Sequence, residues 1–542
     1  MKKLVCLLLT LIPVYGIFAQ TLTRGPYLQS MTNSSVKIMW RTSVPSPSTV
    51  KYGFSPDLLN NTLTDTTQVV NHTIKITGLN PKATYYYSVG FGAETLAGTN
   101  EQHHFTTAPS PGDTSGFKFW VTGDFGAGNN EQISVRRWFE NHLQSNVIDG
   151  WLWLGDNTYT DGTDAEYTRN VFSNTYGYDS IFRFLSFYPI PGNHDYNSVN
   201  RFDDPSQHRG PYFDMVEVFK NAEMGGVASN TENYYSYDYG NTHFIALNSE
   251  LWQYIFFDLP NPYKTWLEND IKSSTKKFKV AYWHQPPYSK GSHDSDDGFE
   301  LFMIGMRQRI IPILEKYGID LVLCGHSHVY ERSYLINKHY GWSGDFNRQT
   351  MLIDSTSGNP DSNRTYIKYT YGMNKDKGTV YAVVGNSGKH EPDNGKMYPA
   401  MYKKYSADKG VGSMILDVRG NTLTASYFKD NGELFDKFRI IKVDSAIISG
   451  IRNNSTIIDL KIYPNPFSNT VMVEFFAREN KQTAITIQNI AGQLAVETIW
   501  TGSSLMGNNK IELNNLQALP AGEYIISIKQ NDELVSEKVV KL

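Results

Sequence analysis

Hydrophobic and polar residues alternate with a period of two along residues 23–107. The segments 36–40 and 73–76 each place every second side chain on one face, as half-buried strands do. Tyr85 follows a Gly-Leu-Asn-Pro turn, which is the arrangement of a tyrosine corner, and Trp40 is the aromatic residue expected in the core. The pattern predicts an N-terminal β-sandwich whose role is structural support.

Beyond a linker at 108–113 that is rich in Pro, Ser and Gly, short apolar runs alternate with amphipathic segments. The amphipathic segments 131–143 and 299–317 predict helices. The apolar runs predict strands at 117–121, 151–154, 187–190, 243–247, 278–283 and 319–324. This alternation predicts a layered α/β domain in which the loops at strand ends carry function.

The regular pattern fades between 333 and 378, which favours a functional loop. Strand patterns return at 379–385 and 413–443, so we expect the α/β domain to extend over 117–443. A second linker is predicted at 451–460, and short alternating strands fill 461–542. The predicted fold class is therefore multidomain, with an N-terminal β-sandwich, a central α/β domain and a C-terminal β-sandwich.

Residues 1–19 have the features of a secretory signal peptide. Two lysines precede an apolar run at 4–14, and the small residue Ala19 stands before the expected cleavage point. The apolar run is too short to span a bilayer, and no other segment is long and apolar enough to do so. Cys6 would leave with the signal, so Cys324 would remain as a single cysteine, and its apolar surroundings favour inert packing.

Length and charge narrow the class of protein further. A chain of 542 residues exceeds one hydrophobic core, which favours two to four domains. Hydrophobic residues make up 40% and charged residues 19%, which is typical of globular protein. The formal net charge of -4 provides no broad basic field, so we expect no binding to a nucleic-acid backbone.

Five short polar clusters each lie at the end of a predicted strand. They are Gly-Asp-Phe-Gly at 123–126, Gly-Asp-Asn-Thr-Tyr at 155–159, Gly-Asn-His-Asp at 192–195, Trp-His at 283–284 and Gly-His-Ser-His at 325–328. Alone, a Gly-Asp pair is commonly a turn, and a single histidine is more often structural than a ligand. Together the clusters supply the oxygen and imidazole donors that suit iron, zinc or manganese. An extended Gly-His-x-His segment would also direct His326 and His328 to the same side.

The order of these clusters resembles the metallophosphoesterase superfamily. Gly126 stands where the general pattern has a histidine, and Tyr159 is added in the second cluster, so the chain resembles the purple acid phosphatase branch. The Tyr-Glu-Arg-Ser segment at 330–333 and a fibronectin type III-like domain over 23–107 fit that branch. Ala281 replaces a valine that is frequent there, at a position of strand packing. The resemblance implies a central sandwich of two sheets flanked by helices.

The resemblance also implies a binuclear metal centre that pairs Fe(III) with a divalent ion, Zn, Mn or Fe. In this sequence the implied ferric ligands are Asp124, Tyr159 and His328, the implied ligands of the divalent ion are Asn193, His284 and His326, and the implied bridge is Asp156. His194 would contact phosphate and assist the leaving group, and His293 is the second candidate acid or phosphate contact. Asp195 would orient His194 or a ligand.

The C-terminal segment 461–542 opens with Tyr-Pro-Asn-Pro-Phe and resembles the sorting domain of type IX secretion cargo, with an ordinary accessory β-sandwich as the alternative. The two resemblances imply a secreted or cell-surface phosphatase, exported through the periplasm with the type IX secretion machinery as partner. It would hydrolyse phosphate monoesters by attack of a metal-activated hydroxide. Two alternatives stay open, namely a phosphodiesterase or nucleotide hydrolase with the same site, and a non-catalytic surface binding protein.

Overall fold

The computed structural model describes residues 20–257, 261–370, 374–393, 395–405, 410–443, 457–477, 479–489, 493–530 and 533–542. The predicted signal peptide at 1–19 lies outside these residues. Two compact units divide the described chain. The first holds the residues up to 368 and those from 376 to 442, and the second holds 369–370, 374–375, 443 and the described residues from 457 to 542. No helix within the described ranges is long and apolar enough to cross a membrane.

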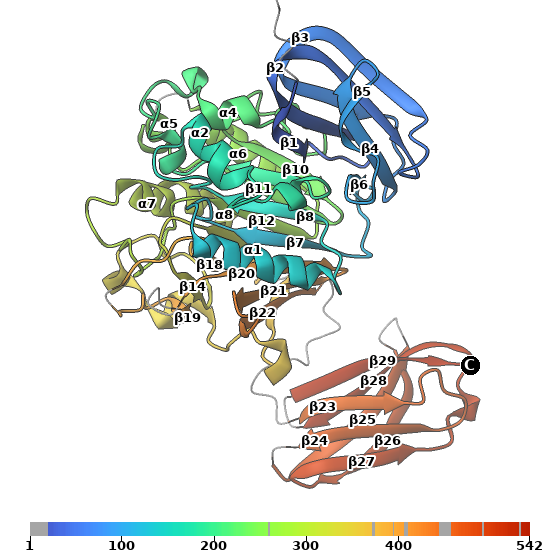
Figure 1. The fold of residues 1–542 in the computed structure, drawn as a ribbon. Helices are drawn as coiled ribbons and strands as arrows, with labels where there is room; N and C mark the ends of the chain where they lie inside the picture. The colour runs from blue at the N-terminus through green and yellow to red at the C-terminus, as the bar shows by residue number, and fades with distance from the viewer. Residues whose placement is uncertain are drawn as a thin grey trace, which may run out of the picture. The chain divides into compact units, whose positions relative to one another are not determined.

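The N-terminal part of the first unit is a β domain (Figure 1). Its strands are β1 (Leu22–Gln29), β2 (Ser35–Gly53), β3 (Asn61–Thr77), β4 (Thr84–Phe91), β5 (Glu94–Gly98) and β6 (His104–Thr106). Trp40 is buried in its core, as predicted. The predicted tyrosine corner is formed, because the backbone N–H of Asn80 donates to the hydroxyl of Tyr85 at 3.0 Å.

Two seven-stranded sheets form the central domain that follows. In spatial order the first contains β17 (Tyr366–Tyr369), β22 (Leu434–Val443), β21 (Thr422–Lys429), β20 (Gly412–Arg419), β7 (Phe117–Thr122), β8 (Gly150–Leu154) and β9 (Phe187–Ile190). The second contains β10 (Tyr235–Tyr239), β11 (Thr242–Ala246), β12 (Phe278–Trp283), β13 (Leu321–Cys324), β18 (Val380–Val384), β14 (Tyr330–Ser333) and β19 (Met401–Tyr405).

Aromatic side chains join the two sheets face to face. The ring of Phe119 on β7 lies 5.2 Å from that of Phe244 on β11, and the ring of Tyr330 on β14 lies 4.0 Å from that of Tyr427 on β21. On the outer side of the first sheet, Phe139 of α1 (Asn130–Leu143) stacks on Trp120 at 3.8 Å. This burial of aromatic surface explains why the sheets and helices form one core.

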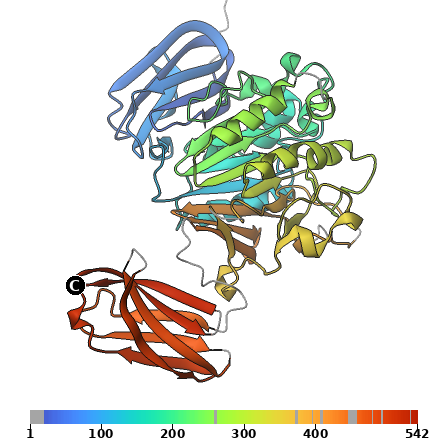
Figure 2. The same cartoon turned by 180° about the vertical axis from the view of Figure 1, so that it is seen from behind.

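Further α-helices and π-helical turns before residue 317 cover the other side and the connections. They are α2 (Asp164–Glu166), a π-helical turn (Tyr167–Val171), α3 (Asp179–Phe182), α4 (Pro211–Met215), α5 (Trp252–Phe256), α6 (Pro262–Ser273), α7 (Leu301–Gly305), a second π-helical turn (Met306–Ile310) and α8 (Ile311–Lys316). Figure 2 shows α6 and α8 on the face of the domain opposite to α1. The predicted central sandwich of two sheets flanked by helices is therefore confirmed.

The segment 333–378 contains more regular structure than its pattern indicated. It holds β15 (Leu335–Ile336), α9 (Arg348–Met351) and β16 (Leu352–Asp354), in addition to β17. The segment is therefore not wholly irregular, and its elements were missed because they are too short to show a period. Strand β17 is held by its place at the edge of the first sheet.

The second unit consists of two packed sheets. One contains β23 (Ile457–Tyr463), β24 (Val471–Ala477) and β27 (Gly507–Leu513), and the other contains β26 (Leu494–Ser504), β25 (Lys481–Asn489), β28 (Gly522–Gln530) and β29 (Glu533–Lys541). Residues 451–456 of the predicted linker lie outside the described residues. Residues 457–460 belong to β23 instead of a linker, because Ile457 is buried in the core of this unit.

The arrangement of parallel strands positions the polar clusters. Strands β7, β8 and β9 are parallel neighbours in the first sheet, and β11, β12, β13 and β18 are parallel neighbours in the second. Every one of the five clusters lies at or after the carboxyl end of β7, β8, β9, β12 or β13. Because the carboxyl ends of parallel strands lie at the same edge of a sheet, the clusters meet at one edge of the sandwich.

Candidate metal centre

Three of the predicted ligands lie on left-handed backbone immediately after a strand. The φ angles are 57° at Asp124, 49° at Asp156 and 68° at His326. Few residues other than glycine adopt this region, although aspartate and histidine are enriched in it, and such conformations cluster at functional sites. The expected extended geometry of the Gly-His-x-His segment is wrong, since the turn at His326 sends its side chain and that of His328 to two neighbouring groups of donors.

The first group surrounds the hydroxyl of Tyr159. This oxygen lies 3.0 Å from Oδ1 of Asp124, 3.1 Å from Oδ2 of Asp156 and 3.2 Å from Nε2 of His328. All four side chains are buried. Burial and the two carboxylates raise the pKa of Tyr159 well above its usual value, so the hydroxyl stays protonated unless a strong Lewis acid replaces its proton.

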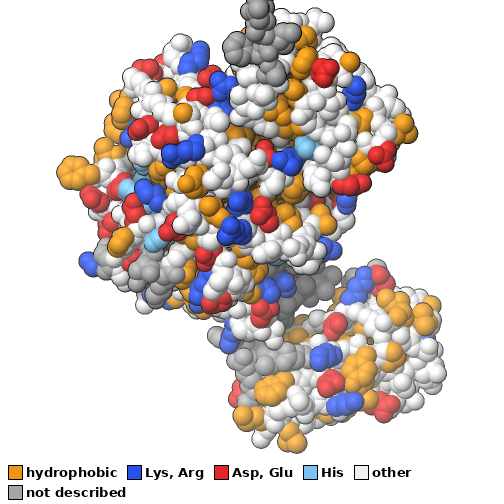
Figure 3. Space-filling view, in the orientation of Figure 1, with side chains coloured by type: hydrophobic (Ala, Val, Ile, Leu, Met, Phe, Trp, Pro, Cys, Tyr) orange, Lys and Arg blue, Asp and Glu red, His pale blue; other side chains and the backbone are white. Residues whose placement is uncertain are grey.

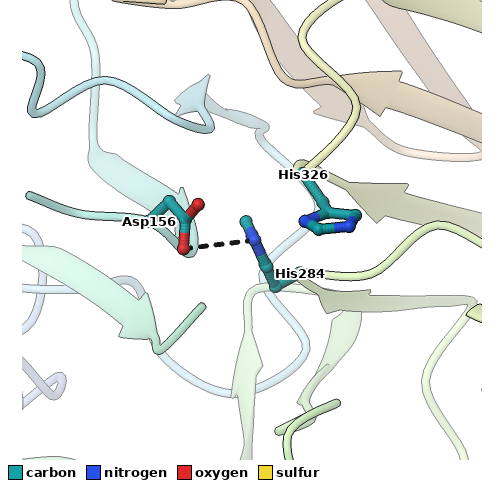
Figure 4. Close-up of side chains that lie close together, drawn as sticks. All are labelled: Asp156, His284 and His326. Carbon is teal, nitrogen blue, oxygen red and sulfur yellow. Dashed lines mark ion pairs between the residues drawn. The ribbon is translucent and has the colours of Figure 1, made fainter. Parts of the chain in front are cut away.

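The second group surrounds Nε2 of His284. This nitrogen lies 3.2 Å from Oδ1 of Asp156 and 3.1 Å from Oδ1 of Asn193. Figure 4 shows Asp156 and His284 directed at each other with His326 beside them, and the three residues can present donor atoms to one ion. Asp156 therefore contributes one carboxylate oxygen to each group, so the seven predicted ligand side chains lie in two adjoining clusters that share it.

Glycines allow this convergence, as Gly155 and Gly325 illustrate. A Cβ atom on Gly155, whose φ is +86°, would lie 2.6 Å from Nδ1 of His284. A Cβ atom on Gly325 would lie 2.5 Å from Oδ2 of Asp124. Any larger residue at either position would displace a predicted ligand.

The donors fit a pair of cations. The carbonyl of Leu154 accepts a hydrogen bond from Nδ1 of His284 at 2.9 Å, so that nitrogen carries the proton and the lone pair of Nε2 is directed at oxygen atoms of Asp156 and Asn193. Acceptors that face each other in this way require a proton or a metal ion between them. Burial opposes a charge on His284, yet Asp156 raises its pKa to about 10.

His326 also has the features of a cation ligand. Its Nε2 atom is buried and forms no hydrogen bond. Burial and the neighbouring histidines 293 and 284 lower its pKa to about 3, so the ring is neutral and able to bind a cation. The set of carboxylate, phenol, amide and imidazole donors contains no thiol, which suits iron, zinc and manganese. Cys324 is buried, and burial raises its pKa well above the usual value, as expected for an inert thiol.

The two histidines predicted to act on substrate lie beside the ligand clusters. The ring of His194 lies 4.6 Å from the ring of Tyr159, and that of His293 lies 3.9 Å from that of His326. Their side chains are 23% and 33% exposed, so both reach solvent at the edge of the buried donors. Histidine side chains are visible among acidic and basic ones at the left of the larger unit in Figure 3.

Asp195 fastens two of the ligand-bearing loops together. Its carboxylate accepts hydrogen bonds from the backbone N–H of Gly192 at 2.7 Å and from that of Asn157 at 3.1 Å, and from the hydroxyl of Tyr167. Burial and nearby Asp156 raise its pKa to about 7. Asp195 thus fixes the loops that hold Asp156 and Asn193, whereas the ring of His194 is held by the backbone carbonyl of Thr160.

Three functional candidates were missed from the sequence. Oε1 of Glu300 lies 2.6 Å from Nδ1 of His293, Oε2 of Glu391 lies 3.2 Å from Nδ1 of His328, and Nζ of Lys389 lies 4.6 Å from the ring centre of Tyr159. Lys389 and Glu391 follow β18, which is parallel to β13, so the end of that strand was the available signal. Glu300 had none, because it begins a helix and stands outside the polar clusters.

Comparisons with known protein families agree with this arrangement. The family described as calcineurin-like phosphoesterase matches residues 117–330, and the purple acid phosphatase N-terminal domain matches residues 26–107. The secretion system C-terminal sorting domain matches residues 461–542. That match implies export and an encounter with the secretion machinery.

Curated relatives are similar over part of their length. The chain is 27% identical to purple acid phosphatase 15 of Arabidopsis thaliana over 54% of each chain, and 24% identical to purple acid phosphatase 13 of the same plant over 69% of this chain and 71% of that one. It is 24% identical to human acid phosphatase type 7 over 57% of this chain and 70% of the relative. The first of these alignments spans about half of the relative.

Solved structures share the fold. The yellow lupin (Lupinus luteus) purple acid phosphatase PPD1 superposes with a TM-score of 0.57 at 18% identity, covering 77% of this chain and 75% of that one. The structure of PhoD superposes with a TM-score of 0.53 at 13% identity, covering 78% of this chain and 94% of that one. The chain therefore contains a purple acid phosphatase N-terminal domain, a calcineurin-like phosphoesterase domain and a secretion system C-terminal sorting domain, and it is similar to purple acid phosphatases over the first two.

Proposed function

We propose that this protein is a secreted phosphatase that hydrolyses phosphate monoesters at a binuclear metal centre. The observation that carries the proposal is the sharing of Asp156 between the Tyr159 group and the His284 group. Two cations held about 3.5–4 Å apart repel each other, and an anionic ligand common to both offsets that repulsion. The two groups of donors are adjacent and share such a carboxylate.

Each group has the donors for a different ion. Asp124, Tyr159 and His328 would hold Fe(III), because phenolate and carboxylate are hard anionic donors, and Asn193, His284 and His326 would hold a divalent Zn, Mn or Fe ion. Such a pair supplies Lewis acidity toward phosphate oxygens and a water acidic enough to act as a nucleophile near neutral pH.

His194 and His293 would act on the phosphate ester itself. Nδ1 of His194 donates to the carbonyl of Thr160 at 2.7 Å, which leaves Nε2 on the side of Asp156, at 3.9 Å from Oδ2. His293 is held through Nδ1 by Glu300 and also faces the ligand clusters. Protonated imidazoles in these two places would bind phosphate oxygens and donate a proton to the leaving alcohol.

The test compares metal content, absorption spectrum and turnover on one preparation of the full chain. We expect two metal ions per chain, one of them iron, a visible tyrosinate-to-iron band, and faster hydrolysis of a monoester than of a matched diester. Faster turnover of the diester or of a nucleotide would assign the site to those substrates instead. Bound metal with no hydrolysis of any phosphate ester would mean that the protein is a binding protein.

A further inference from the structure

The N-terminal β domain reaches the edge of the metal centre through a pair of arginines. Arg24 on β1 and Arg41 on β2 are opposite each other in the paired strands. Nη2 of Arg24 lies 2.6 Å from Oδ1 of Asp164, and Nη1 of Arg41 lies 2.5 Å from Oδ2 of the same carboxylate. Arg24 is almost fully buried and also donates to the backbone carbonyl of Asp164 at 2.9 Å and to the Thr168 hydroxyl at 3.1 Å.

Asp164 begins the single helical turn α2, and Glu166 ends it. Thr163 caps this turn, and its backbone N–H donates to Oε2 of Glu166 at 3.0 Å. The same carboxylate accepts the backbone N–H of Thr160 at 2.6 Å and that of Asp161 at 3.1 Å. Glu166 therefore closes the loop 160–163 onto α2, and the arginine pair holds α2 against the N-terminal domain.

Thr160 connects this loop to the site. It follows Tyr159, and its carbonyl accepts hydrogen bonds from Nδ1 of His194 at 2.7 Å and from Nδ2 of Asn197 at 2.9 Å. The carbonyl thus fixes the ring orientation of His194 and keeps the proton on Nδ1. Gly162 brings the loop close to the same segment, because a Cβ atom there would lie 2.6 Å from the carbonyl oxygen of His194.

We propose that the N-terminal domain positions His194 for proton transfer, through the path from Arg24 and Arg41 to Asp164, and from Glu166 to Thr160. This inference rests on the proposed role of His194 as the group that protonates the leaving alcohol. Arg24, Arg41, Asp164 and Glu166 are positioning residues, since they act on the ester only through the loop. The N-terminal domain would then contribute to turnover as well as to stability.

The chain offers a matched control in a second ion pair between the same two domains. Nζ of Lys37 on β2 lies 2.5 Å from Oε2 of Glu217, which is outside the loop and the metal centre. Glu217→Gln weakens the contact between the domains as Asp164→Asn does, with no link to Thr160. Glu166→Gln tests the loop directly, because its amide would place a donor against the backbone N–H of Thr160 or Asp161.

The first measurement is hydrogen exchange of the full chain, which does not depend on activity. Asp164→Asn and Glu166→Gln should raise the exchange rate of the peptide covering 157–163 by roughly 5-fold or more, whereas Glu217→Gln should leave that peptide unchanged. Equal exchange in all four proteins, or an equal increase in the Glu217→Gln protein, would overturn the path from the arginines to the loop.

The second measurement is the leaving-group dependence of kcat. A misplaced acid matters most for a poor leaving group, so both loop variants should lower kcat for glycerol phosphate by about 10-fold and for p-nitrophenyl phosphate by less than about 2-fold, with the visible band retained. Adding either substitution to His194→Ala should cause no further loss. Equal losses of kcat on both esters would overturn the inference. So would a loop substitution that lowers kcat as much in the His194→Ala protein as in the wild-type protein. If the wild-type protein hydrolyses neither ester, the proposed function itself fails, and the exchange data still decide the path.

Discussion

Oε1 of Glu300 lies 2.6 Å from Nδ1 of His293, and Oε2 of the same carboxylate lies 3.6 Å from Nε2 of His326. One side chain therefore faces both a predicted metal ligand and a histidine predicted to act on the phosphate ester. A carboxylate held against a histidine fixes the orientation of the ring, so Glu300 can position both histidines.

Glu300→Gln should lower kcat for a phosphate monoester by about 10- to 100-fold, because an amide presents only one acceptor to two histidines. The visible band should persist, since Glu300 has no contact with the Tyr159 group among its described hydrogen bonds and ion pairs. Glu391→Gln is the matched variant. Glu391 faces His328, so this substitution should perturb the visible band. An unchanged kcat in the Glu300→Gln protein would contradict this role.

Removing a ligand should differ from removing a substrate contact. His328→Ala and Asp156→Ala should abolish turnover and lower the metal content, because each deletes a donor from a buried group. His293→Ala should reduce turnover by about 10²-fold or more with the metal largely retained. Metal analysis beside steady-state kinetics separates the two cases, and loss of metal from the His293→Ala protein would show that His293 is a ligand.

Tyr159→Phe should remove the visible absorption band, because phenylalanine has no oxygen to donate charge to iron. Tyr167→Phe is the control, since Tyr167 is also buried nearby but donates its hydroxyl to Asp195. Its spectrum should match that of the wild-type protein. A band that survives in the Tyr159→Phe protein would assign the colour to another ligand.

His243 should make the stability of the central domain depend on pH. Burial disfavours its charge, but hydrogen bonds of 2.8 Å to Asp238 and to Asp270 outweigh it and raise the pKa to about 9, with Lys276 also 3.4 Å from Asp238. The stabilisation from this raised pKa is fully present below the unfolded-state pKa, which is near 6.5. It is lost as the pH rises through the folded-state pKa of about 9.

That contribution is about 3 kcal/mol at most for a shift of this size. His243→Gln should therefore unfold at a lower temperature than the wild-type protein at pH 6, and the difference should shrink toward pH 9. Thermal unfolding followed by circular dichroism at the two pH values is the measurement. A difference that is the same at both would mean that the ring stabilises the fold by packing and not by its charge.

Strand positions and donor types could be predicted from the sequence because both are local. The runs at 187–190 and 278–283 are the strands β9 and β12 to the residue, since a buried strand shows as a short apolar segment between turns. The donor types Asp, Tyr, Asn and His could be predicted for the same reason, because they stand in short clusters at the ends of the strands. The tyrosine corner at Tyr85 was also readable, because its partner Asn80 is only five residues away.

Only the tertiary structure decided which donors meet and what holds them. The order of parallel strands brings Asp156 between Tyr159 and His284. The left-handed turn at His326 directs the side chains of His326 and His328 to different groups of donors. Glu300, Glu391 and the arginine pair on Asp164 reach the site across long stretches of chain, and no local period records such contacts. The sequence by itself determined the elements and the chemistry of the donors. Their convergence depended on strand pairing and loop geometry, because those are set by packing between residues far apart in the chain.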